Sequence, residues 1–514
     1  LFTENKHENY INKFETVNYD REALKEIQNK LQDKEDDWKL SDFDISEEKQ
    51  TLSIKRILFA LNFFKRSFKK ELQKQNIKNY IGTFLNAHIS THVTTDKAVA
   101  VQIFELQNTR GISLDLIEKV KAKLMKAIYL QDSHSETTIK IIQNNFAEIY
   151  KLEEQISESS FRGDLPLEEI LNYHLRMVDD GSKLTQEKPD FRQPSIDNRE
   201  ESILTYLDKR ISESENAVSY IVDLVERFKQ TVQFLSVDLR ELDTKNNLIG
   251  DVMILSKFYS THLFILIYHK FKSDISLFFK DIEIFKLWER LLFTSNFHEK
   301  YYRQIYRDNY EWLYTEIIKI DEITRVKDII YKFVKNGFRE DLFEDNNLQK
   351  TVSKFVSDEK EQILTNAFYF FNDKMVYALY KYEIDQKANL KELRKIIKEG
   401  RSVEHILPQN WQWEWINENP QKRITNKGNK FNKSINNVIN GLGNLLLLTP
   451  SENSSQSNNH PKNKVYKCCS GGSYEEHNAS RNNWSEPNNW KSKIEERGEK
   501  IYNFMLHYFQ LNKS

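Results

Sequence analysis

A histidine follows a glutamate near the C-terminal end of this 514-residue chain, and two asparagines stand downstream of the pair. They are Glu404 and His405, then Asn444 before the apolar run 445–448, and Asn453 nine residues after Asn444. A neutral histidine, with a pKa of about 6.5, is the usual base for activating water. Carboxylate and amide oxygens suit Mg²⁺ or Mn²⁺, ions that neutralise charge on a phosphate. These residue types predict metal-assisted phosphodiester hydrolysis.

The order of the elements around these residues is typical of a ββα-metal (HNH) finger. A strand ends at His405, a second strand follows Asn444, and a short helix supplies the last ligand. Neighbouring strand residues point to opposite faces, so Glu404 and His405 can share one site only if the strand bends there. Asn444 could hold the imidazole in one tautomer. The chain has 2 cysteines, which are adjacent, so a zinc knuckle of four cysteines is excluded.

Residues 401–514 resemble the C-terminal HNH domain of the GmrSD family of type IV restriction endonucleases. The matching segments are 404–409 (Glu-His-Ile-Leu-Pro-Gln) and 443–448 (Gly-Asn-Leu-Leu-Leu-Leu), followed by Asn453. The roles that this resemblance implies are a general base at His405, an orienting residue at Asn444, metal ligands at Asn453 and Glu404, and a phosphate contact at Lys464.

A second segment, residues 103–119, resembles the end of the ParB-like N-terminal domain of the same family. It contains a Phe-Glu pair, an Asn-Thr-Arg-Gly turn and a helix that opens with Leu and Asp. Asn108 and Arg110 either contact a nucleoside triphosphate or only build the turn. The Asp-Gly-Gln-Gln-Arg motif that the family links to nucleotide hydrolysis does not occur in the chain. We therefore expect a piece of a longer protein that begins after that motif.

Composition favours a cytoplasmic, multidomain enzyme. Hydrophobic residues make up 39% and charged residues 30%, which is enough for sizeable cores. Only 2 cysteines in 514 residues argue for a reducing compartment. No signal peptide is visible. The most apolar stretch, residues 252–268, includes serine, lysine and histidine, so we expect a buried helix there and no membrane span.

The hydrophobic periods predict a mainly α-helical chain. Helical patterns cover most of residues 8–80, and a short strand is expected near residues 80–85. The predicted domains are a partial ParB-like α/β region over 1–130, a helical linker over 131–198, an all-α middle domain over 199–400 and the ββα-metal domain over 401–514.

DNA is the expected partner. The whole chain has a net charge of −1, yet residues 401–514 carry 15 Lys and Arg against 10 Glu and no Asp. A positive surplus suits a surface that meets phosphates. The family resemblance implies modified DNA as the target, either glucosylated hydroxymethylcytosine or, in relatives such as SspE, phosphorothioate DNA. A double-strand cut by one HNH site needs two sites or two visits, so a homodimer is expected.

Two other functions fit the same residues. One is a nucleotide-regulated DNA-binding sensor whose HNH finger is inactive, and a metal-binding measurement separates it from a nuclease. The other is a defence-associated ribonuclease, which a comparison of DNA and RNA cleavage identifies.

Overall fold

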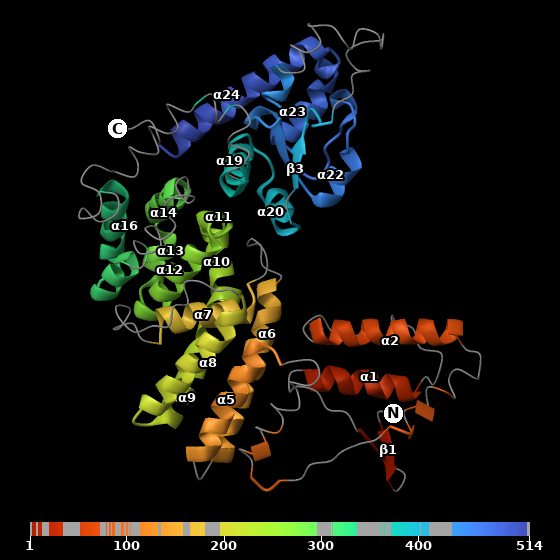
Figure 1. Cartoon of the computed structure of the whole chain (residues 1–514), viewed down its shortest axis with the longest axis vertical. Helices are drawn as coiled ribbons and strands as arrows, with labels where there is room; N and C mark the ends of the chain where they lie inside the picture. Colours follow the sequence, from red (N-terminus) through yellow and green to blue (C-terminus); the bar gives the residue numbers. More distant parts are fainter. Residues whose placement is uncertain are drawn as a thin grey trace. The chain divides into compact units, whose positions relative to one another are not determined.

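The structure of the chain is a computed structural model, and it is mainly helical (Figure 1), as predicted. None of its described helices is both long and apolar enough to cross a membrane. The residues described are 3–6, 9–12, 20–33, 52–71, 79, 82–83, 85–87, 94–96, 99–100, 103, 114–131, 135–157, 165–179, 196–295, 310, 312–336, 360, 364, 372–400, 402–410 and 434–510.

The chain divides into two compact units. Unit 1 consists of Leu1–Glu158, Pro166–Asn172 and Pro189–Val237, and unit 2 consists of Ser159–Leu165, Tyr173–Lys188 and Asp238–Ser514. The division after Val237 falls inside the segment predicted as one all-α middle domain. Helix α7 (Leu167–Met177) contributes to both units and is largely buried, unlike a solvated linker.

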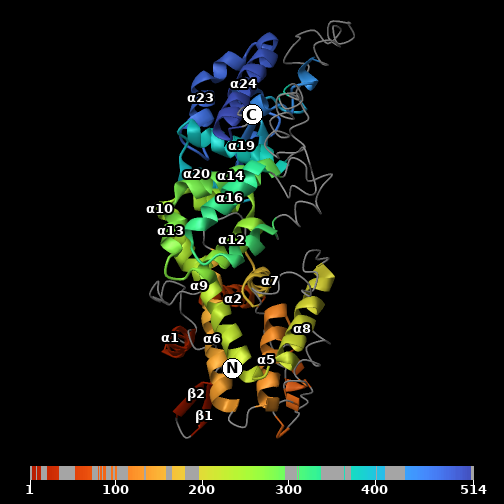
Figure 2. The ribbon, with the colours of Figure 1, turned by 90° about the vertical axis from the view of Figure 1, so that its left-hand side faces the viewer.

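Unit 1 is a helical assembly in which α5, α6 and α9 pack on one another (Figure 2). On α6 the buried apolar positions are Ile139, Ile142, Phe146 and Ile149, a spacing of three and four residues that places them on one helical face. The elements of unit 1 besides α7 are β1 (Thr3–Lys6), β2 (Asn9–Asn12), α1 (Arg21–Asp33), α2 (Leu52–Glu71), α5 (Leu116–Gln131), α6 (Ser135–Ser157), α8 (Ile196–Glu213) and α9 (Ala217–Gln233).

The N-terminal part differs from the sequence prediction in two places. β1 and β2 form an antiparallel hairpin in which Lys6 pairs with Asn9, within a region where helical periods were expected from residue 8 onward. The strand expected near residues 80–85 is absent from the described positions there, because Gly82, Thr83 and Leu85 are helical. Segments of four to six residues are too short for a hydrophobic period to distinguish a strand from a helix.

Unit 2 holds a helical part followed by the segment with the candidate site. The helix η4 (Phe234–Asp238) belongs to unit 1 except for its last residue. The helices of unit 2 before the candidate site are α10 (Leu239–Lys245), α11 (Leu248–Leu255), α12 (Lys257–Lys270), α13 (Ile275–Lys280), α14 (Ile282–Ser295), α16 (Thr324–Asn336), α19 (Asn372–Asp385) and α20 (Leu390–Lys398). Then come β3 (Ser402–His405), η9 (Leu442–Asn444), β4 (Leu445–Leu448), α22 (Pro450–Gln456), η10 (Pro461–Asn463), α23 (Gly472–Ser480), η11 (Arg481–Trp484), η12 (Pro487–Asn489) and α24 (Trp490–Tyr508).

The apolar stretch 252–268 is two helices rather than one. α11 ends at Leu255, α12 begins at Lys257, and Ser256 between them has an extended backbone. Ser260 on α12 donates to the carbonyl of Val252 and accepts from the indole N–H of Trp288 at 3.2 Å. These polar residues satisfy the backbone at the break, so the stretch is part of the core, as predicted.

Buried charged residues join the two parts of unit 2. Arg394 on α20 pairs with Asp243 on α10 and with Asp251 on α11, the latter at 3.3 Å. Lys381 on α19 pairs with the same Asp251 at 2.7 Å and with Glu289 on α14 at 3.2 Å. All five side chains are at least nine-tenths buried. The helices that precede β3 are therefore fixed to the helical part by ion pairs that water does not reach.

Candidate active site

The candidate site is built on two antiparallel strands, β3 and β4, followed by helix α22. Glu404 faces Leu446 across the pair and His405 faces Leu445, in an unbroken register, so β3 does not contain the bend that the sequence analysis required between these two residues. All four residues of β4 are buried leucines, so this strand is fixed in the core. The short turn η9 leads into β4 and contacts α24 closely. A Cβ at Gly443 would lie 1.7 Å from the carbonyl oxygen of Ile494, so only glycine fits there.

His405 lies at the end of β3 and is half-buried. Its Nε2 lies 2.9 Å from Oδ1 of Asn440, which also accepts from the Gln409 side chain at 2.8 Å. An amide oxygen only accepts hydrogen bonds, so Nε2 carries the ring hydrogen and Nδ1 is the unprotonated nitrogen. Burial lowers the pKa of His405 below 6.5, and the charge of Lys464 adds to this, whereas the bond to Asn440 opposes it. The imidazole is therefore neutral near pH 7.

Asn444 does not contact the imidazole ring. It is fully buried, and its side chain accepts from the N–H of Leu407 at 2.8 Å and donates to the carbonyls of Leu407 and Ile439. Its own carbonyl accepts from the N–H of Ile406. Asn444 thus fixes the backbone directly after His405. The direct contact expected of Asn444 is made by Asn440, which sequence reasoning missed because nothing distinguishes it from the other asparagines nearby.

Glu404 and Lys464 form a buried pair. The Lys464 ammonium donates to Oε1 of Glu404 and, at 2.7 Å, to the carbonyl of His405, while Tyr466 donates to the same Oε1 at 3.4 Å. Burial raises the pKa of Glu404 and lowers the pKa of Lys464, and their mutual attraction opposes both shifts. Both side-chain bonds go to Oε1, and the carboxylate also accepts a hydrogen bond from the backbone of His405.

The position of Lys464 corrects one expectation. Its side chain has no exposed surface, so the ammonium does not reach the solvent where a phosphate would lie. A lysine in the interior without a partner would lose its charge, and Glu404 supplies that partner. Lys464 supports the end of β3 in place of the phosphate contact that the sequence predicted.

Asn453 lies on α22 and reaches back to β3. Thr449 caps this helix by accepting from the N–H of Glu452, and Pro450 occupies its first turn. The Asn453 amide nitrogen donates to the hydroxyl of Ser402 and to the carbonyl of Val403, the residue before Glu404. With the nitrogen used in this way, Oδ1 remains as the atom of Asn453 able to act as a ligand.

Of the seven residues predicted for function, five surround β3, β4 and α22, and the other two lie outside the described residues. The five are His405, Glu404, Asn444, Asn453 and Lys464, and the two are Asn108 and Arg110.

No group of three or more His, Cys, Asp or Glu side chains that could hold a metal occurs in the described part of the chain. An ion held near β3 would have one carboxylate and one amide oxygen from the protein. Mg²⁺ accepts so small a set because it keeps several waters and binds substrate phosphate oxygens, so the donors fit this ion.

Arg497 on α24 connects the start of β4 to helix α19 and so supports the candidate site. Its Nη1 donates to the carbonyls of Leu442, Gly443 and Leu445, the last at 2.8 Å. Its Nη2 donates to Glu383 on α19 at 3.2 Å. Glu383 is buried, which raises its pKa. Arg497 therefore ties the start of β4 to a helix that precedes the predicted domain boundary at residue 401.

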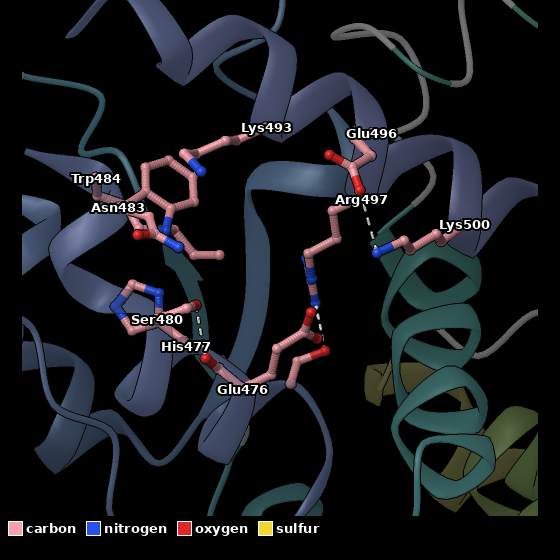
Figure 3. A pocket seen from close by; sticks show the side chains of 11 residues that line it. Glu476, His477, Ser480, Asn483, Trp484, Lys493, Glu496, Arg497 and Lys500 are labelled. Atoms are coloured by element: carbon pink, nitrogen blue, oxygen red, sulfur yellow. Dashed lines mark hydrogen bonds and ion pairs between the residues drawn. The ribbon is translucent and has the colours of Figure 1, made fainter. Parts of the chain in front are cut away.

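A pocket of about 230 Å³ lies beside this scaffold (Figure 3). Its walls come from α23, η11 and α24, and Ile406 is the residue from the end of β3 that reaches it. His405, Glu404 and Asn453 do not line it, so the pocket is separate from the residues predicted to carry chemistry.

Comparison with known proteins identifies the region that contains the site. The family model of the C-terminal domain of GmrSD restriction endonucleases matches residues 343–504. No curated protein and no solved structure matches the chain. The predicted family resemblance is thus confirmed for this C-terminal region, which indicates a restriction endonuclease that acts on DNA. The match begins ahead of the predicted boundary at 401 and includes α19 and α20. The ParB-like resemblance upstream stays a prediction.

Proposed function

We propose that the chain is a metal-dependent DNA endonuclease of the HNH type that works in a bacterial restriction or anti-phage defence system. The observation that carries this proposal is the state of His405, a neutral imidazole whose tautomer Asn440 fixes, within a region that matches a restriction endonuclease domain. A base of this kind accepts a proton at neutral pH, which is what hydrolysis of a phosphodiester needs.

In the proposed reaction, Nδ1 of His405 removes a proton from a water molecule as the water oxygen attacks phosphorus. The bond from phosphorus to the 3′ oxygen breaks, and that oxygen takes a proton from solvent. Asn440 holds the Nε2 hydrogen throughout and stabilises the imidazolium that forms. Asn444 holds the backbone behind the ring in place.

Mg²⁺ or Mn²⁺, when bound, would neutralise charge on the scissile phosphate and the leaving oxygen. Glu404 and Asn453, the latter through Oδ1, are the residues proposed to hold the ion. Support comes from the contacts of the Asn453 amide nitrogen with Ser402 and with the carbonyl of Val403, the two residues before Glu404. Glu404 and His405 lie on opposite faces of the regularly paired β3, so the proposal requires the end of this strand to bend when the ion binds.

The finer properties are proposals that rest on the family resemblance. The targets would be modified DNA, and a nucleoside triphosphate bound by the N-terminal region would regulate cutting. A homodimer would supply two sites for a double-strand break.

One observation favours a second candidate, a DNA-binding sensor with an inactive finger. Lys464 already neutralises Glu404, so the carboxylate has a partner without any ion. In that case the domain would bind DNA without binding Mg²⁺ tightly enough to cut it.

Cleavage of plasmid and phage DNA by the full chain tests the proposal. DNA with and without modified bases is incubated with Mg²⁺ or Mn²⁺, and with EDTA, and RNA is run alongside. His405→Ala should lower the cleavage rate by about 10²–10⁴-fold, the usual contribution of a general base. Asn482→Ala, an exposed change on η11, is the matched control. DNA cutting that persists in His405→Ala would refute the proposed base.

Calorimetric titration with Mn²⁺ separates the two candidates when no DNA is cut. If Mn²⁺ binds, Asn453→Ala abolishes this binding and no DNA is cut, the domain binds metal but needs an activator for cleavage. The absence of any binding would favour the sensor, and degradation of RNA alone would favour the ribonuclease.

A further inference from the structure

Glu383 on α19 is a buried carboxylate that binds two residues of the segment after β4. It precedes the predicted domain boundary at residue 401 and is 1% exposed. Its Oε1 accepts from Nη2 of Arg497 on α24 at 3.2 Å, and its Oε2 accepts from the backbone N–H of Ser473 on α23 at 2.8 Å. Each oxygen of this carboxylate therefore has a donor from a different helix of the matched domain.

The guanidinium of Arg497 is held in one orientation by these contacts. The side chain extends from α24 (Figure 3), and its Nη2 donates to Glu383 and to the hydroxyl of Ser473, each at 3.2 Å. The ring centroid of Tyr382 lies 5.9 Å from its Cζ. A guanidinium is planar, so acceptors that fix Nη2 also fix the direction in which Nη1 points.

The acceptors of Nη1 include the strand partner of His405. The carbonyl of Leu445 accepts from Nη1 of Arg497 at 2.8 Å. Leu445 is the residue that faces His405 across β3 and β4. A shift of the guanidinium would therefore move the residue that pairs with the proposed base.

A second connection to the base runs through Asn444. Nη1 also binds the carbonyl of Gly443, the residue before Asn444, at 3.1 Å. Asn444 in turn accepts from the N–H groups of Ile406 and Leu407, the two residues that follow His405. The backbone at His405 and directly after it thus depends on one guanidinium.

Helix α19 is itself fixed on another side. Lys381, two residues before Glu383, forms buried ion pairs with Asp251 on α11 and with Glu289 on α14. Helix residues two positions apart point to different faces, so α19 contacts the helical part of unit 2 through Lys381 and the candidate site through Glu383. The Glu383 carboxylate therefore holds Arg497 from a fixed position.

We propose that Glu383 is a positioning residue for His405 and sets the orientation of the imidazole through Arg497. The inference rests on the proposed nuclease function, in which His405 is the base. A base must lie within hydrogen-bond reach of the proton that it removes. Misplacement by about 1 Å can lower a rate about 10²-fold even when the substituted residue lies far from the chemistry. Glu383 touches neither DNA nor metal in this proposal, so its loss should affect kcat.

Glu383→Gln tests the contact with little change in volume. A glutamine keeps one acceptor oxygen and replaces the other with an NH₂ group, so a donor would face either Arg497 or the N–H of Ser473. Glu392→Gln on α20 is the matched control. A single oxygen of Glu392 accepts from both the N–H and the hydroxyl of Ser470, which a glutamine oxygen can also do. Glu383→Asp keeps the charge on a shorter side chain.

The full chain is assayed with a DNA that the unmodified protein cuts. Glu383→Gln should lower kcat about 10–100-fold and leave KM within about twofold. Glu383→Asp should recover part of the lost kcat, and Glu392→Gln should match the unmodified protein. Hydrogen–deuterium exchange, which needs no activity, should show protection lost in residues 402–410 and 442–448 of Glu383→Gln and kept in α11 and α14.

Unchanged kcat in Glu383→Gln, with unchanged exchange over these two segments, would overturn the proposal. A loss of protection throughout unit 2, with KM raised as strongly as kcat is lowered, would overturn it as well, because that pattern means general destabilisation. Arg497→Lys is the second variant if thermal denaturation shows that Glu383→Gln does not fold. A lysine lacks the planar fork that binds the carboxylate and the carbonyls together, so kcat should fall selectively, and a normal kcat would contradict the proposal.

Failure of the proposed nuclease would look different. The unmodified chain would then cut no DNA under any condition. Hydrogen–deuterium exchange of Glu383→Gln and Glu392→Gln would still show whether Glu383 fixes the strand pair that carries His405.

Discussion

At the scale of single residues, the contact between Asn440 and His405 decides which nitrogen of the imidazole could act as the proposed base. The Asn440 oxygen also stabilises the protonated ring, because it accepts from Nε2–H in both states. Burial outweighs this effect and leaves the pKa of His405 below 6.5. The imidazole is therefore more deprotonated at neutral pH than an ordinary histidine, and activity should fall as the pH drops through the lowered pKa.

The pH profile of kcat/KM for DNA cleavage tests this assignment. Its acid limb should lie below pH 6.5 in the unmodified protein. Asn440→Asp places a negative charge beside the ring, favours the protonated form and should move the acid limb to higher pH. Asn440→Ala should lower kcat without that upward shift. Superimposable profiles for the three proteins would exclude Asn440 as the residue that tunes the base.

The Glu404–Lys464 pair gives a prediction about stability. Lys464→Met leaves the Glu404 carboxylate buried without a partner, a change that costs about 3–5 kcal/mol in other buried pairs. The lost partner raises the folded-state pKa of Glu404 further above its ordinary 4.5. The protonated acid is then favoured in the folded protein, so the destabilisation should be largest near neutral pH and fade as pH falls toward 4.5.

Urea denaturation of both proteins between pH 5 and 8 measures that difference. The double variant Glu404→Gln/Lys464→Met removes both charges and should lose less stability near pH 7 than Lys464→Met alone. A penalty that is the same at every pH would mean that the destabilisation comes from lost packing rather than from the uncompensated carboxylate.

At the scale of elements, Gly443 and Gly498 let the turn η9 lie directly on α24. Gly443→Ala would put a methyl group 1.7 Å from the Ile494 carbonyl, so the turn must move away from the helix. Overpacking of this kind costs about 1–3 kcal/mol, and more where backbone cannot yield. We expect loss of DNA cleavage with a lower Tm. Gly82→Ala is the control, since a Cβ there meets nothing within 4 Å.

The two strands and the helix also show how far the sequence could predict the site. His405 and Asn453 stand out in the sequence as candidates because the proposed chemistry restricts their residue types and the elements around them fix their spacing. The contact from Asn440 could not, because it depends on how the segment before η9 packs over His405. The burial of Lys464 was missed for the same reason, since a lysine in a loop-like sequence is usually exposed.

At the scale of the molecule, the sequence predicted the mainly helical class, and its predicted boundary at residue 401 falls inside one of the two compact units. Composition changes near residue 401, yet Arg497 on α24 binds Glu383 on α19, and Arg394 and Lys381 pair with helices further upstream. Long-range pairs of this kind leave no mark on local hydrophobic periods. A shift in composition is therefore a weak guide to where a domain begins.

This connection predicts how the C-terminal region unfolds. A fragment of residues 401–514 lacks Glu383, the carboxylate partner of Arg497. Arg497 would then bind the carbonyls at the start of β4 without a carboxylate that holds its guanidinium in position. We expect it to show no cooperative transition in urea, whereas residues 238–514 should unfold in a single step.

In the full chain, Arg394→Met leaves Asp243 and Asp251 buried and should reduce hydrogen-exchange protection in α11 and β4 together. Protection lost in α11 alone would show that the helical part of unit 2 and the segment with the candidate site unfold independently, and would contradict the prediction.

The buried counter-charge of Glu404 has a consequence for how such an enzyme survives in a cell. A zinc finger collapses when its ion is removed, since the metal holds the fold together. Here the carboxylate is already paired with Lys464, so removal of the proposed Mg²⁺ or Mn²⁺ by a chelator should stop DNA cleavage without unfolding the protein. At low concentrations of divalent ions the protein would then remain folded but inactive. Added Mg²⁺ or Mn²⁺ would restore activity as fast as the ion diffuses into the site, because no refolding is needed.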